Sequence, residues 1–274
     1  VQINLLIDVV IASLLPRGSV SFLYYADRVN QLPLGVIGVA VGTALLPLLS
    51  RQLRAGDDAA AAGSMNRALE FALLLTVPGA AALMVMPDLV VSVLFERGAF
   101  GAAETSATSA ALAAYAIGLP AYVLIKVLAP GFFAREDTAT PVKIAALCVA
   151  INLVLNLVLM GPLLHVGIAL ATAISAWINA GLLAWMLVRR GHFVADSRLR
   201  RAVPRTLLAS AVMAGILWFA AGALADVAAI DPAREAVVLA LLVVLGLVAF
   251  GAGALCFGAA RIADIKRLLD RSPG

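Results

Sequence analysis

The stretch from Val237 to Phe257, VVLALLVVLGLVAFGAGALCF, decides the fold class of this chain. It contains 21 residues and no charged side chain. About twenty apolar residues in a helix cross the roughly 30 Å hydrocarbon core of a bilayer. The stretch also lacks the alternation of polar and apolar residues that marks the strands of a membrane barrel. It therefore predicts a membrane-spanning helix.

The rest of the chain has the same character. Of its 274 residues, 63% are hydrophobic and only 13% are charged, whereas soluble domains are roughly half apolar and about a quarter charged. No soluble fold of this size would bury so much apolar surface, so we expect an all-α, polytopic transmembrane bundle of about eight spans. The predicted spans are residues 2–15, 20–49, 68–94, 106–133, 141–160, 166–188, 203–224 and 235–258.

The basic residues predict the orientation of these spans. Taking alternate connections as one side gathers fifteen Lys and Arg residues, near 51–67, 135–143, 189–205 and 261–271. The other side holds Arg17, Arg97 and Arg234. Because cytoplasmic loops carry the positive excess, we expect the fifteen, and the C-terminus, to be cytoplasmic. The net charge of +4 then reflects topology and gives no support to a nucleic-acid partner.

Two charged residues, Asp27 and Arg28, lie inside the second predicted span, where an ionised side chain costs about 2.5–3.5 kcal/mol. Because they are adjacent, they point about 100° apart and do not face each other. We expect each to find a partner on another helix, in water or in a substrate. One reading is an interhelical ion pair. The other is a hydrated cavity in which the Arg28 guanidinium binds an anionic group such as phosphate.

The residues around this pair favour a cavity wall. Ser21 precedes it by two turns, and Pro33 after it bends the helix by removing a backbone donor. Gly35, Gly38 and Gly42 then offer a small face for close packing and, with Pro33, a hinge. Lys126, deep in the fourth span, either lines the same cavity or extends to the interface.

A second group of polar residues is rich in oxygen. Asp8 lies in the first span, Asn152 and Asn156 share one face of the fifth, and Thr172 lies in the sixth. Carboxylate, amide and hydroxyl oxygens suit a hard cation, which predicts coupling to Na⁺ or H⁺. The alternative is that these side chains bond across helices simply as packing contacts.

The sequence gives no support to catalysis. It contains no nucleophile elbow, phosphate-cradling glycine loop or zinc spacing, and its two histidines, His165 and His192, lie at span ends. We expect no cofactor other than a coupling ion. A secondary transporter is the simplest reading, and the basic residues between Arg189 and Arg205 are expected near anionic head groups.

Two stretches carry a family resemblance. Residues 19–51 read SVSFLYYADRVNQLPLGVIGVAVGTALLPLLSR, and residues 126–145 read KVLAPGFFAREDTATPVKIA. Both resemble the MurJ (MviN) family of lipid II flippases. The resemblance implies a two-lobed transporter of the multidrug/oligosaccharidyl-lipid/polysaccharide exporter superfamily. Residues 1–190 would be its second six-helix lobe, with the first span clipped, and residues 191–274 two additional C-terminal helices with a basic cytoplasmic tail. The N-terminal lobe would be missing from this sequence.

The resemblance also implies a cargo and site residues. The cargo would be undecaprenyl-pyrophosphate-linked disaccharide pentapeptide, moved from the inner to the outer leaflet of the bacterial plasma membrane for cell-wall synthesis, with membrane lipids and other cell-wall synthesis proteins as partners. The cavity residues fall on Ser21, Asp27 and Arg28, with Lys126 as a further candidate, and an acidic position of some members is Gln31 here. A sodium site would fall on Asp8, Asn152, Asn156, Thr172 and the carbonyl of Ile168. In such members one of these positions, Asn156 here, is acidic.

Two other readings remain. A relative would export another lipid-linked oligosaccharide or a drug, although a drug exporter is expected to carry a negative cavity rather than Arg28. A membrane scaffold or lipid enzyme would lack such a cavity, and an enzyme would cluster His or Asp at a membrane face.

Overall fold

The computed structural model describes the backbone of residues 2–228 and 230–258, and their side chains except those of residues 2–6 and 36–43. Every regular element in these ranges is an α-helix, as the sequence predicted. The helices are α1 (Gln2–Ala12), α2 (Ser19–Arg54), α3 (Asp58–Val85), α4 (Pro87–Phe95), α5 (Ala102–Phe133), α6 (Ala139–Arg189), α7 (Ser197–Ala228) and α8 (Pro232–Cys256).

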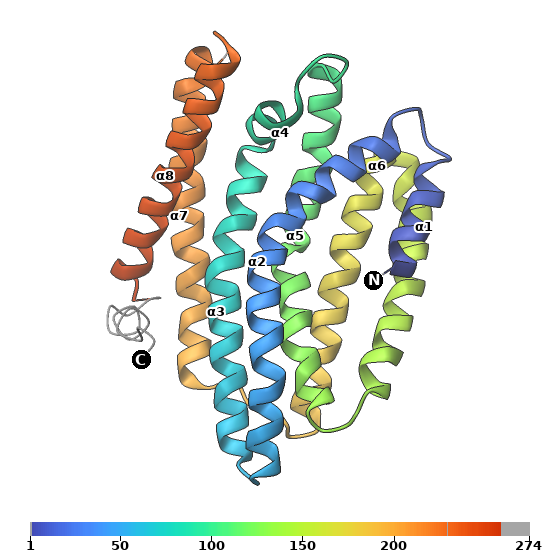
Figure 1. Ribbon diagram of the computed structural model, residues 1–274, viewed down its shortest axis with the longest axis vertical. Coiled ribbons are helices and arrows are strands. Elements are labelled where there is room, and N and C mark those ends of the chain that lie inside the picture. Colours follow the sequence, from blue (N-terminus) through green and yellow to red (C-terminus); the bar gives the residue numbers. More distant parts are fainter. Residues whose placement is uncertain (1, 229, 259–274) are drawn as a thin grey trace.

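The long helices run up and down beside one another (Figure 1). The connections α2–α3, α5–α6 and α6–α7 lie at the lower end of Figure 1, whereas α1–α2, α4–α5 and α7–α8 lie at the upper end. The basic connections are therefore at one end, as the alternation of charge predicted. Which end faces the cytoplasm remains a prediction.

Helix α6 is two spans rather than one. Its 51 residues include Leu164, whose backbone is non-helical (φ 51°, ψ −132°), and Figure 1 shows the chain reversing at the upper end. At the reversal a Cβ on Gly167 would lie 2.3 Å from the carbonyl oxygen of Leu159. The tight approach therefore requires glycine, and the two halves match the predicted spans 141–160 and 166–188.

Two predicted helix starts were too late. Helix α3 begins at Asp58 instead of residue 68, and α7 begins at Ser197 instead of residue 203. Each start is capped, because Asp57 accepts a hydrogen bond from the Ala60 N–H at 2.8 Å and Asp196 accepts one from the Leu199 N–H at 2.7 Å. The helices thus extend beyond the apolar runs from which they were predicted. The predicted span 68–94 is also divided at Met86, where Pro87 starts α4.

Five of the described helices are long and apolar enough to cross a membrane: α3, α5, α6, α7 and α8. Helix α5 is the most buried of them and forms the centre of the bundle, with Leu112, Leu119 and Val123 inaccessible to solvent. Helices α7 and α8 pack against each other and lie on the α3 flank (Figure 1). The division into domains at residue 190 stays a prediction.

Candidate functional site

The oxygen-rich residues predicted from the sequence lie together between α1 and the two halves of α6. Asn156 Nδ2 donates hydrogen bonds to Asp8 Oδ1 at 2.7 Å and to Asn152 Oδ1 at 3.2 Å. Thr172 Oγ1 lies 3.1 Å from both Asp8 Oδ2 and the Ile168 carbonyl oxygen, and it accepts from Asn152 Nδ2 at 3.3 Å. We call these five residues the oxygen cluster.

The oxygen cluster has the donor set of a site for a small hard cation. Four of its residues are buried and Thr172 is half-buried, and Asn156 Oδ1 has no hydrogen-bond partner among the described residues. An unpartnered buried oxygen is costly unless an ion or water supplies the missing contact. Carboxylate, amide, hydroxyl and carbonyl oxygens with no sulfur or imidazole fit Na⁺. The gathering of the five residues is confirmed, and the binding of an ion stays a prediction.

The second predicted site surrounds Arg28, and one expectation about it was wrong. Asp27 and Arg28 find partners on their own helix. Gln31 Nε2 donates to Asp27 Oδ2, while Arg28 Nη1 donates to Gln31 Oε1 at 3.5 Å. The guanidinium also lies 4.8 Å from the centre of the Tyr24 ring. Gln31 and Tyr24 are three or four residues from the charges, a spacing that brings side chains together on a helix.

Arg28 nevertheless points out of the bundle. Ser21, Tyr24, Arg28 and Gly35 are all exposed, and their spacings of three, four and seven residues place them on one face of α2. We call this the Arg28 face. An exposed arginine in an otherwise apolar bundle is the wall of a wet space or of a contact with another part of the protein, because lipid alone does not solvate it.

A small cavity joins the two sites. It has a volume of about 90 Å³, and its lining includes Asp8 from the oxygen cluster, Asp27 and Tyr24 beside Arg28, and Tyr115 from α5. The carboxyl groups of Asp8 and Asp27 therefore border one space. A charge gained or lost at one of them acts on the other, since both lie in a low-dielectric region.

The hinge predicted at Pro33, Gly35 and Gly38 stays a prediction. Pro33 lies inside α2, and Figure 1 shows α2 inclined in its upper part and nearly upright below. A Cβ on Gly35 would meet nothing within 4 Å, so no described helix packs closely against Gly35, and its packing role stays a prediction. Gly38 and Gly42 fall in 36–43, outside the residues whose side-chain surroundings are described.

Lys126 is not brought to this site by any contact. It is exposed on α5, and within the described part of the chain its ammonium forms no ion pair or hydrogen bond. Both predicted roles, lining a cavity and extending to an interface, stay predictions.

The sequence analysis did not identify Gln31 and Tyr24 as partners of Asp27 and Arg28, although their spacing of three or four residues was a usable signal. It had no signal for Tyr115.

Comparison with known proteins places the chain in a family. A family model described as lipid II flippase MurJ matches residues 1–228. A probable lipid II flippase MurJ of Rhizobium meliloti is 46% identical over 98% of this chain and 51% of its own length. The Rhizobium tropici relative is 49% identical over 80% of this chain and 41% of its own length. The chain spans about half the length of the curated relatives it matches.

Solved structures of transporters are also similar to this chain. A lipid II flippase MurJ in an inward closed conformation superposes with a TM-score of 0.78 at 25% identity, covering 93% of this chain and 50% of that one. A transporter of the MOP superfamily from Pyrococcus furiosus gives a TM-score of 0.61 at 18% identity, covering 94% of this chain and 60% of that one. The second likeness shows a shared fold and no more.

Proposed function

Because the chain belongs to the lipid II flippase MurJ family, we propose that it forms about half of a flippase for undecaprenyl-pyrophosphate-linked muropeptide. The protein would carry this lipid from the inner to the outer leaflet of the bacterial plasma membrane by alternating access. Lipid II is the cargo that the names of its relatives give. Other cell-wall synthesis proteins as partners stay a prediction.

The observation that supports this proposal best is the Arg28 face. A pyrophosphate carries about two negative charges that hydrocarbon does not solvate. Arg28 presents a guanidinium fork that forms paired, charge-assisted hydrogen bonds with phosphate oxygens. Gln31 and Tyr24 hold that fork on α2 without covering it. The half of the protein outside this sequence would supply the opposite wall.

The work that these residues do is transport without catalysis. No covalent bond of the cargo changes, so the protein must only replace the hydration of the head group while the polyprenyl tail stays in lipid. The basic residues of the connections at the lower end of Figure 1 support a cytoplasmic location for that end. The basic residues between 261 and 271 in the sequence support the same location for the C-terminus.

We further propose that Na⁺ or H⁺ couples to transport at the oxygen cluster. Asp8, Asn152, Asn156, Thr172 and the Ile168 carbonyl would hold the ion. A bound cation supplies positive charge beside Asp8. Because Asp8 and Asp27 border one cavity, this charge would offset part of the negative charge of Asp27. The electrostatic attraction that Arg28 experiences near Asp27 and Gln31 would then be weaker.

The test of the proposal is complementation of bacteria depleted of their own lipid II flippase, with the full-length protein that contains this sequence. We expect wild type to rescue growth and Arg28→Ala to fail at normal protein level. Arg54→Ala is the matched control, because Arg54 lies at the end of the same helix and bonds only the Ser50 carbonyl among the described residues. It should rescue fully.

Rescue by Arg28→Ala would remove the Arg28 face from the transport path. Failure of the wild type, with the protein present in the membrane, would contradict lipid II as the cargo and favour another lipid-linked oligosaccharide. In both cases an immunoblot of membrane fractions measures how much of the protein is present in the membrane.

A further inference from the structure

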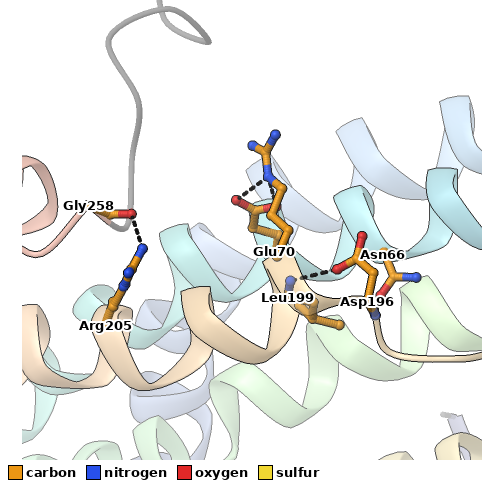
Figure 2. Close-up of polar contacts among 7 residues, drawn as sticks. Asn66, Glu70, Asp196, Leu199, Arg205 and Gly258 are labelled. Carbon is orange, nitrogen blue, oxygen red and sulfur yellow. Dashed lines mark hydrogen bonds and ion pairs between the residues drawn. The ribbon is translucent and has the colours of Figure 1, made fainter.

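A hollow of about 230 Å³ opens between α3, the start of α7 and the end of α8. It shares no lining residue with the oxygen cluster or the Arg28 face. Its polar lining comes from Glu70 on α3, from Gly258 after α8, and from four residues of α7, which are Ser197, Arg198, Arg201 and Arg205. We call it the arginine pocket. Figure 2 shows Glu70, Arg205 and Gly258 around this region.

The arginine pocket carries net positive charge. Arg198, Arg201 and Arg205 are three and four residues apart and so share one face of α7. Glu70 is the one acidic residue among the lining residues. Among the lining residues alone, three guanidinium groups and one carboxylate give a formal charge of +2, which favours an anionic ligand such as a phosphodiester.

Two of the three arginines are held in place. Arg198 Nε donates to both oxygens of Glu70, at 2.8 and 3.1 Å. Arg205 Nη1 donates to the Gly258 carbonyl at 3.0 Å (Figure 2). Arg201 is exposed and, within the described ranges, forms no ion pair or side-chain hydrogen bond. Among the described residues, two arginines of the pocket thus have partners, and the guanidinium of the third, Arg201, has no anionic partner.

The backbone around the pocket is fixed as well. Asn66 accepts a hydrogen bond from the Asp196 N–H at 3.1 Å, and its amide donates to the Val194 carbonyl at 2.9 Å. Asp196 in turn caps α7 (Figure 2). The connection before α7 is therefore tied to α3, and the three arginines start from a rigid base. Preordered donors lose little freedom when an anion binds.

The surface next to the pocket is apolar. Directly after Arg205, Leu207, Leu208 and Val212 of α7 are each about half exposed, and Phe257 is exposed at the end of α8. A charged pocket bordered by an exposed apolar belt lies where the hydrocarbon meets the head groups. A soluble phosphate would gain nothing from that belt, whereas the acyl chains of a lipid would cover it.

We propose that the arginine pocket binds the phosphate of an anionic phospholipid in the leaflet at the basic end of the bundle. The head group would lie among Arg198, Arg201 and Arg205, and the acyl chains would lie along the exposed side chains of α7 and α8. This lipid is a bound component of the α3–α7–α8 contact and not a transported cargo. The inference stands without the proposed function.

The test uses the full-length protein in detergent, titrated with phosphatidylglycerol and followed by native mass spectrometry. We expect wild type to bind this lipid at least tenfold more tightly than the Arg201→Gln/Arg205→Gln variant. Arg200→Gln is the matched control, because Arg200 is exposed on the same turn but does not line the pocket. Its affinity should stay within twofold of wild type. Since Arg201 forms no ion pair or side-chain hydrogen bond with any described residue, the single Arg201→Gln variant serves if the double variant does not fold.

Three results would overturn the proposal. An equal loss in Arg200→Gln would show diffuse surface attraction in place of a site. Equal binding of phosphatidylcholine with the same acyl chains would show that the pocket does not select for the net negative charge of the head group. Inorganic phosphate that competes as well as phosphatidylglycerol would identify a soluble anion as the ligand.

Discussion

The oxygen cluster and the Arg28 face both border one small cavity, through Asp8 and through Tyr24, yet they are built differently. The oxygen cluster is closed: three helical segments bring its side chains together, and they bond one another. The Arg28 face is open, because its partners come from the same helix and its side chains are exposed. We therefore expect the oxygen cluster to contribute to the stability of the fold. We expect the Arg28 face to act together with a surface that lies outside this sequence.

The largest expected effect is the loss of stability on removing the centre of the oxygen cluster. Asp8→Ala would leave one buried N–H of Asn156 without its acceptor, at a cost of about 1–3 kcal/mol, whereas Thr172 keeps the Ile168 carbonyl as its acceptor. Arg28→Ala, at an exposed position, should change stability by less than about 0.5 kcal/mol. Thermal unfolding of both variants in detergent compares them. Equal losses of Tm would break the distinction between a closed and an open site.

The effect of Na⁺ on stability is a second test of the difference between the oxygen cluster and the Arg28 face. A cation that binds only the folded protein adds about 1.4 kcal/mol of stability at roughly ten times its Kd. We expect the Tm of wild type and of Arg28→Ala to rise when Na⁺ replaces K⁺, and the Tm of Asp8→Asn not to change. An Asp8→Asn variant that still responds to Na⁺ would place the ion elsewhere.

A smaller effect is expected from Gln31, which is hydrogen-bonded to both Asp27 and Arg28. Gln31→Met keeps the length of the side chain but removes both hydrogen bonds, so Arg28 retains only its contact with Tyr24. We expect rescue of flippase-depleted cells to need about two- to fivefold more protein, on the scale of about 0.5–1 kcal/mol. Gln52→Met, at a glutamine of the same helix that bonds Ser64, should rescue like wild type. Equal behaviour of the two variants would leave Gln31 without a role.

The smallest effect concerns an ion pair outside both sites. Hydrogen bonds from Thr140, together with the Arg190 guanidinium, lower the pKa of Asp137 from 3.8 to about 2. A lowered folded-state pKa stabilises the protein above pH 4, and this contribution disappears as the pH falls toward 2. Asp137→Asn should therefore cost about 0.2–1 kcal/mol at pH 7 and nothing near pH 2. A constant difference in Tm between wild type and variant across that range would contradict the assignment.

Helix positions were predictable from the sequence because lipid requires long apolar runs. The ends were not, because α3 and α7 continue beyond the apolar run into segments that Asp57 and Asp196 cap. Capping at these positions is a local signal that the search for apolar runs ignored.

The two sites were predictable to different degrees. Residue type identified the four polar members of the oxygen cluster, since each is a polar residue in an apolar span, and the family resemblance added the carbonyl of Ile168. The partners of Arg28 required attention to spacings of three and four. The arginine pocket was visible only as a basic segment, because Glu70 and Gly258 complete it from distant parts of the chain.

The hydrogen bond between Asp8 and Asn156 also has a consequence for how the protein is made. The two residues are 148 positions apart, and at roughly 5–20 residues per second their synthesis is separated by about 7–30 s. Asp8 thus reaches the membrane long before α6 exists to bond it. Its carboxyl group must be accommodated by water, by the translocation machinery or by earlier parts of the protein during that interval, so the arrival of α6 completes the placement of α1.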